Sequence, residues 1–159
     1  MSADRAASVL ARLLNRSRST GENYNLLLSR FVIERLLYRL SASPHADHFV
    51  LKGALLFKIW YDVPQRPTRD ADLLGFGPDD MDSVAAVFHE LCVIEVDDGI
   101  VFEAGSVKTA EIRKEAGYGG VRIELRATLE QTLPWLTHVL AQDDKAGWVL
   151  EVQDKPDTG

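Results

Sequence analysis

The chain has 159 residues, of which 46% are hydrophobic and 26% charged, and its formal net charge is −6. This composition excludes a fibre, a disordered tail and a bundle of membrane spans, and a chain of this length can bury a core without disulfides or a structural metal. The single cysteine and the lack of a secretory signal pattern predict a cytoplasmic protein with no membrane partner.

The charge is unevenly distributed. Residues 1–48 carry a net +3, residues 49–132 a net −6 and residues 133–159 a net −3. The acidic total argues against holding nucleic acid by bulk charge, because such binding neutralises many phosphates. Two interpretations of the N-terminal arginines stay open: a local basic patch, or the solvated faces of two helices. The patch would consist of Arg12, Arg16, Arg18, Arg30, Arg35 and Arg39.

The N-terminal part is predicted to form a pair of helices. Apolar residues recur at helical spacing over residues 6–14, and a polar loop is expected over 15–21. A second helix over 26–40 has a wide apolar surface and a polar stripe that includes Arg39. Pro44 prevents its continuation.

The middle of the chain alternates between extended and helical patterns. Residues 49–53 predict a brief extended entry and a glycine turn, and residues 54–61 a buried helix. A strand over 69–77 leaves through glycines, and a helix over 79–92 starts with acidic residues, which the helix dipole favours.

The second half has the pattern of a sheet. Two strands are expected on either side of a turn at Gly105, followed by a strand over 121–129 whose apolar and charged residues alternate. A short helix near 135–141 and a strand near 148–152 complete the chain. Helices first and strands later predict an α+β protein with a mixed sheet packed against helices.

The most informative residues are two aspartates in one predicted strand. Asp70 and Asp72 are two apart and therefore share a face, while Ala71 points the other way. Two close carboxylates repel unless a cation lies between them, and Mg²⁺ is typically held by one or two carboxylates plus substrate phosphates. A surface turn with two solvated acids is the alternative. Upstream, the Lys52-Gly53-Ala54 turn precedes a predicted helix, and a helix N-terminus favours phosphate.

Two separate motifs, in this order, resemble a known family. The segments are Phe49-Val-Leu-Lys-Gly-Ala-Leu-Leu-Phe57 and Arg66-Pro-Thr-Arg-Asp-Ala-Asp-Leu-Leu-Gly75. They resemble the AbiEii-type nucleotidyltransferases, the toxins of type IV toxin–antitoxin and abortive-infection systems, in the DNA polymerase β-like nucleotidyltransferase superfamily. The resemblance spans roughly residues 25–130.

The resemblance implies a transferase that uses an NTP and Mg²⁺ or Mn²⁺, acts on an RNA acceptor such as tRNA, and has a cognate antitoxin. By position, Asp70 and Asp72 would bind metal. The nucleotide-binding residues would be Lys52, Gly53, Ala54, Arg66 and Thr68. The family usually has Gly-Gly or Gly-Ser at the turn, so Gly53-Ala54 retains the backbone donors but lacks a serine contact.

A third carboxylate is also implied by the resemblance. Relatives carry it on a strand after the Val121-Arg-Ile segment, followed by a helical domain. Glu124, on the charged side of its strand, completes the predicted catalytic set with Asp70 and Asp72, and Glu130 is an alternative.

Three regions are expected on this basis: N-terminal helices (1–48), a nucleotidyltransferase core (49–132) and a divergent C-terminal tail (133–159) without the family's helical domain. A second hypothesis comes from a different class of function. The chain would then be a catalytically inactive, truncated remnant that binds a nucleotide or a partner protein.

Overall fold

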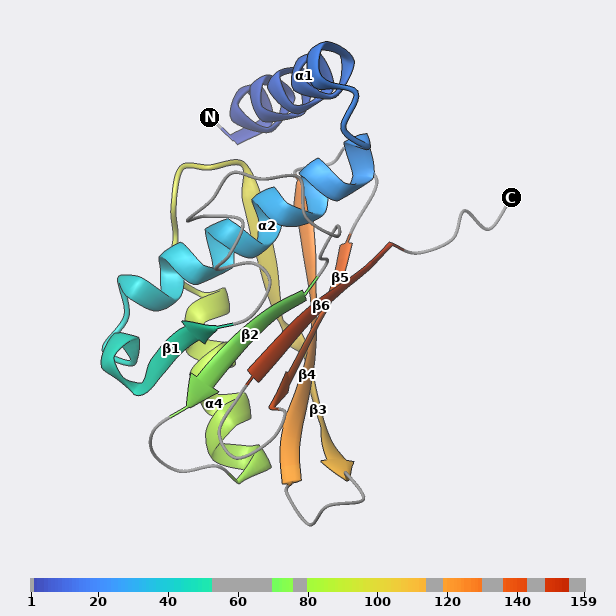
Figure 1. Cartoon of the computed structure of the whole chain (residues 1–159). Helices are drawn as coiled ribbons and strands as arrows, with labels where there is room; N and C mark the ends of the chain where they lie inside the picture. The colour runs from blue at the N-terminus through green and yellow to red at the C-terminus, as the bar shows by residue number, and fades with distance from the viewer. Residues whose placement is uncertain are drawn as a thin grey trace.

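The computed structural model describes residues 2–52, 70–75, 80–113, 119–129, 136–142 and 148–154. Helices pack on one six-stranded sheet of order β1-β2-β6-β5-β4-β3 (Figure 1). The helices are α1 (Ser2–Thr20), α2 (Tyr24–Ser41) and α4 (Met81–Cys92), with the 3₁₀ helix η1 (Ala46–His48). The strands are β1 (Phe49–Lys52), β2 (Asp70–Gly75), β3 (Ile100–Arg113), β4 (Gly119–Leu129), β5 (Leu136–Gln142) and β6 (Trp148–Asp154).

The α+β class and the N-terminal helix pair are confirmed, but the sheet is not mixed. Every pairing between the described strands is antiparallel. The antiparallel pairing of β3 to β6 follows from their order, because strands that are successive in the chain are also neighbours in the sheet and only a few residues separate them. A parallel pair requires a crossover of a dozen or more residues.

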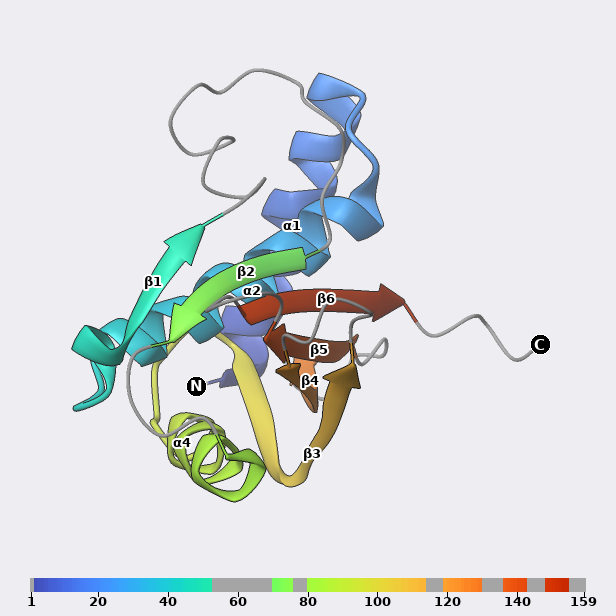
Figure 2. The same ribbon diagram turned by 60° about the horizontal axis from the view of Figure 1, so that its bottom comes forward.

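The hydrophobic core lies between one face of the sheet and the two helices α2 and α4. Figure 2 shows the sheet curving around this side of the molecule. Val32, Leu36 and Phe88 come from the helices and meet Ile123 and Leu125 of β4, and all five are at most 2% exposed. The alternation predicted for residues 121–129 is therefore confirmed: its apolar residues are buried, and Arg122 and Arg126 are exposed.

Local side-chain chemistry sets the helix ends. The Asn23 side chain accepts hydrogen bonds from the backbone N–H groups of Asn25 and Leu26 in the first turn of α2, and the Asp80 side chain accepts one from Ser83 in the first turn of α4. The first helix continues to Thr20, so the polar loop expected from residue 15 is wrong. The Thr20 hydroxyl donates to the Arg16 carbonyl, and Gly21, at φ 76°, ends the helix in the left-handed region.

The β segments contain two further differences from the sequence prediction. A turn was expected at Gly105, but this glycine lies within β3, where the pairing with β4 shifts between Glu103 and Lys108. A helix was expected near residues 135–141, but this segment is β5, whereas the strand near 148–152 is confirmed as β6. Pairing with β4 on one side and β6 on the other overrides the weak helical pattern.

A buried ion network joins α2 to the loop before β3. Arg39 is 1% exposed and donates two hydrogen bonds to the Asp98 carboxylate, at 2.8 and 3.1 Å. Arg35 donates a third, at 2.7 Å. Arg39 also donates to the carbonyls of Ile94 and Ile100, which places its guanidinium fully inside the fold. The interpretation of Arg39 as part of an exposed stripe is therefore wrong.

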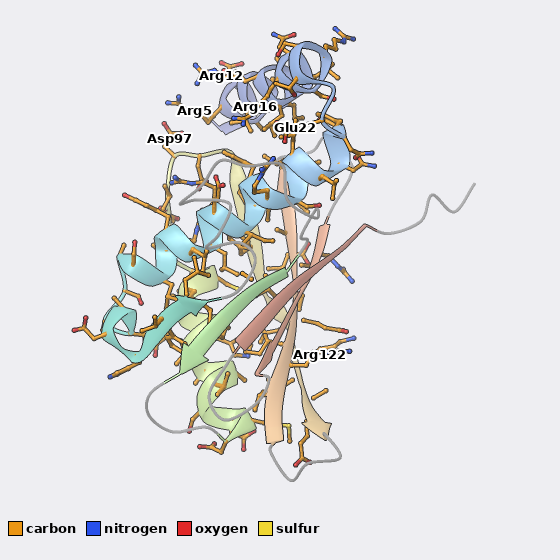
Figure 3. All side chains as sticks on the ribbon, in the orientation of Figure 1. Arg5, Arg12, Arg16, Glu22, Asp97 and Arg122 are labelled. Atoms are coloured by element: carbon orange, nitrogen blue, oxygen red, sulfur yellow. The ribbon has the colours of Figure 1, made fainter. Side chains whose placement is uncertain are left out.

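The network reduces the basic patch considered from the sequence. Arg35 and Arg39 belong to the buried network, and Arg16 and Arg30 form ion pairs with Glu22. The other two candidates, Arg12 and Arg18, are exposed on α1. Figure 3 shows Arg16 beside Glu22. Structural roles thus account for four of the six candidate residues.

Among the glycines whose surroundings the structure describes, Gly99 should be the least tolerant of substitution. Its φ is +81°, and a Cβ added there would lie 2.8 Å from the Ala6 backbone nitrogen of α1. Gly99→Ala should therefore lower the free energy of unfolding by about 1–3 kcal/mol. Gly21→Ala is the matched control, because Gly21 has a similar φ of +76° but open space around it. Urea denaturation of both variants tests this, and equal losses would contradict the close approach of α1.

Cys92 should be unreactive in the folded protein. It is buried at the end of α4, and burial raises the pKa of its thiol to about 11, against a smaller opposing effect of Arg39. The thiolate is the reactive form, so thiol reagents should modify Cys92 slowly at pH 7 to 8 and rapidly once urea unfolds the chain. Fast labelling of the native protein would contradict its placement in the core.

Candidate active site on the distal face of the sheet

The two aspartates lie in β2 at positions that alternate with core residues of the same strand. Ala71 and Leu73 are 0% and 2% exposed and belong to the core cluster that includes residues of α2 and α4. Because successive positions of a strand alternate, positions 70 and 72 belong to the other face of the sheet, here called the distal face. The side chains of Asp70 and Asp72 lie outside the described residues, so their backbone positions carry the argument.

The strand register aligns a row of positions across the distal face. Asp70 lies opposite Glu151 of β6, Glu151 opposite Val139 of β5, Val139 opposite Glu124 of β4, and Glu124 opposite Lys108 of β3. Directly opposite residues share a face, with Cα atoms about 4.5–5.5 Å apart. Glu151 is therefore the residue across the ladder from Asp70.

A second row runs beside the first. Asp72 lies opposite Lys52 of β1 on one side and opposite Val149 of β6 on the other. The row continues through Ala141 of β5 to Arg122 of β4. The register thus brings Lys52, the start of the predicted phosphate-binding turn, next to one of the predicted metal ligands.

The order of the strands favours Glu151 over Glu124 as the third carboxylate. Strands β6 and β5 lie between β2 and β4, so Glu124 is three strand spacings, about 14 Å, from Asp70 across the ladder. Carboxylates that share a Mg²⁺ ion each approach it to about 2.1 Å. Glu124 is too distant for that role, whereas Glu151 is adjacent.

The sequence interpretation missed Glu151 for a topological reason. The sequence predicts a strand near residues 148–152 but not its neighbours. The placement of that strand between β2 and β5 is a long-range pairing that no local pattern specifies. Glu124 is the sequence's candidate because it lies on the charged side of its strand, but two strands, β6 and β5, lie between that strand and β2 in the sheet.

Several predicted site residues lie outside the described residues. They are Gly53, Ala54, Arg66 and Thr68, together with the helix expected over 54–61 and the alternative ligand Glu130. Among the side chains that the structure does describe, no three metal-binding groups lie close enough to hold an ion. The carboxylates of Asp70 and Asp72 are not among those side chains.

The donor set on the distal face fits a hard divalent cation. Three carboxylate-bearing positions, Asp70, Asp72 and Glu151, occupy adjacent places on two paired strands. Oxygen ligands are those that Mg²⁺ and Mn²⁺ prefer. An α+β sheet that presents such a set beside a lysine defines a candidate site for chemistry on phosphates.

Comparison with protein families agrees with this class. The family model described as "Nucleotidyl transferase AbiEii toxin, Type IV TA system" matches residues 35–140, well over half of the chain. The chain therefore belongs to the AbiEii nucleotidyl transferase toxin family. Nucleotidyltransferases of this kind generally use a divalent metal and an NTP. Comparison with curated proteins and comparison with solved structures each found no match.

The described helices do not meet the requirements of a membrane span. None of those in the described ranges is long and apolar enough to cross a bilayer.

Proposed function

We propose that this protein transfers a nucleotidyl group from an NTP to an RNA acceptor such as tRNA, in the cytoplasm, under the control of a cognate antitoxin. The observation that carries the proposal is the register that places Asp70 opposite Glu151 and Asp72 opposite Lys52. Membership of the AbiEii family supports the reaction class. The division of the chain near residues 48 and 132 stays a prediction.

Each residue of the site has a role in this proposal. Asp70, Asp72 and Glu151 would hold Mg²⁺ or Mn²⁺, which supplies polarisation of the reacting phosphate. Lys52 and the backbone N–H groups of Gly53 and Ala54 would hold the β- and γ-phosphates. Arg66 and Thr68 would orient the nucleotide.

The transfer itself needs one bond to form and one to break. The acceptor hydroxyl oxygen bonds to the α-phosphorus while the bond to the departing pyrophosphate breaks. A carboxylate of the set accepts the hydroxyl proton. Lys52 and the turn neutralise the charge that develops on the pyrophosphate, which is the usual way such sites stabilise the transition state.

The direct test is incubation of the full chain with each labelled NTP, Mg²⁺ and total tRNA. The proposal expects label in the RNA with at least one NTP, and loss of labelling when EDTA removes the metal. Calorimetric binding of NTP–Mg²⁺ without any transfer would instead favour the inactive, nucleotide-binding remnant.

A further inference from the structure

A pocket of about 490 Å³ opens on the distal face where β3 bulges away from β4. Its lining consists of Glu103, Gly105, Ser106, Lys108, Glu124, Leu125 and Arg126. Five residue steps separate the pairing positions Glu103 and Lys108 of β3, whereas two separate their partners Arg126 and Glu124 of β4. The extra residues of β3 therefore form the wall of the pocket, and bulges of this kind recur beside active sites.

The bulge has a specific support. The Ser106 hydroxyl donates to the Glu103 carbonyl at 2.6 Å and accepts the backbone N–H of Arg126 at 2.7 Å. One side chain thus substitutes for the ladder hydrogen bonds that the extra residues interrupt. The Arg126 guanidinium lies 3.7 Å from the Glu103 carboxylate, which positions both groups at the rim. The pocket is consequently part of the folded sheet.

The pocket shares a face with the candidate active site. Lys108 and Glu124 are in the register row that leads through β5 and β6 to Asp70. Glu124 is three strand spacings from Asp70, about 14 Å, and Lys108 is four, about 19 Å. Arg122 is exposed two residues before Glu124 in the same strand, and it points away from α2 and α4 (Figure 3). By register, the pocket and the positions of the Asp pair therefore belong to the same face of the described sheet.

The chemistry of the lining suits one nucleotide of a single-stranded RNA. Two cations, Lys108 and Arg126, are matched by two carboxylates, Glu103 and Glu124, so the lining has no net charge and does not favour a free anion. Carboxylates accept hydrogen bonds from the exocyclic amine of cytosine, and Lys or Arg contact the phosphates on either side of a base.

We propose that this pocket binds a nucleotide of the single-stranded end of the acceptor RNA, upstream of the reacting hydroxyl. Glu124 accepts a hydrogen bond from the exocyclic amine of a cytosine, and Lys108 and Arg122 contact the flanking phosphates. The inference rests on the proposed function, because the strand that reaches this pocket is the acceptor that the Asp pair would modify. It gives Glu124 a role in substrate selection instead of metal binding.

Fluorescence anisotropy with labelled single-stranded oligoribonucleotides tests the phosphate contact. Lys108→Ala should weaken binding about tenfold and reduce the slope of log affinity against log salt by about 1, because one phosphate contact is lost. Arg12→Ala is the matched control, since it removes an exposed cation from α1. The proposal would be overturned if these two variants bound RNA with equal affinities and equal salt slopes. It would also be overturned if Lys108→Ala changed only the KM for the NTP.

Base selection is tested with oligonucleotides that differ by a cytosine-to-uracil change. Glu124→Ala should remove a preference for cytosine of about tenfold without changing the salt slope. Glu95→Ala is the matched control because Glu95 is exposed in the loop before β3. An unchanged preference in Glu124→Ala would contradict the assigned contact.

The failure of this inference can be distinguished from the failure of the proposed function. If label transfer succeeds while both pocket variants bind RNA normally, only this inference fails. If the pocket variants weaken RNA binding but the parent transfers no label, the proposed reaction fails.

Discussion

Replacing Asp70 or Asp72 with asparagine should lower kcat for nucleotidyl transfer at least about a hundredfold. Each substitution keeps the shape of the side chain but removes a negative charge from the set that would hold the metal. Both positions lie on the distal face of β2, and the core residues that alternate with them, Ala71 and Leu73, are unchanged. The variants should therefore unfold at the same urea concentration as the parent.

The measurement is the initial rate of label transfer at saturating NTP and RNA, with Asp82→Asn as the control. Asp82 is an exposed acid in the first turn of α4, on an element that packs against the opposite face of the sheet. Full activity in Asp70→Asn and Asp72→Asn would remove the aspartates from the mechanism. Loss of activity in Asp82→Asn to the same extent would show that the assay reports folding instead.

Removing the Asp98 carboxylate should have the largest effect on stability. Asp98→Ala leaves the buried Arg39 guanidinium without its ion partner, and breaking a buried pair in this way costs about 3–5 kcal/mol. The neighbouring Asp97 provides the control: its ion pair with Arg5 is about half exposed on both sides, so Asp97→Ala should leave the urea midpoint unchanged. Similar midpoints for the two variants would contradict the structural role of the network.

The same network should make the fold sensitive to acid. Burial of Asp98 opposes its ionisation, but hydrogen bonds from Arg39, Arg35 and the Ile100 backbone outweigh burial and hold the pKa of its carboxyl below the usual range. A carboxyl whose pKa is lower in the folded state stabilises the fold at pH values above its unfolded-state pKa of about 3.9. This stabilisation is lost as the pH falls through the folded-state pKa. Urea midpoints below pH 4 should therefore fall more steeply in the parent than in Asp98→Ala.

Local sequence patterns predicted the helices and strands whose formation depends mainly on their own residues. The helices over 26–40 and 79–92 and the alternating strand over 121–129 agree with α2, α4 and β4, because each has a clear apolar period. The first helix was predicted too short, since the polar segment after Leu14 has little hydrophobic period yet continues the helix to Thr20.

Long-range pairing accounts for what the sequence could not reveal. Nothing in residues 136–142 indicates that they form a central strand between β4 and β6. The burial of Arg39 likewise depends on Asp98, 59 residues away. The pair Asp70 and Asp72 was identifiable from its spacing alone, whereas Glu151 became a candidate only when the register placed it opposite Asp70.

The most direct test compares Glu151→Ala with Glu124→Ala in the label-transfer assay at saturating RNA. Glu151 lies across the ladder from Asp70, and Glu124 lies three strands away in the same row. The predicted result is a loss of kcat in Glu151→Ala that matches the loss in Asp70→Asn, with kcat retained in Glu124→Ala. Retained activity in Glu151→Ala, or an equal loss of kcat in both variants, would contradict an active site built on the paired strands β2 and β6.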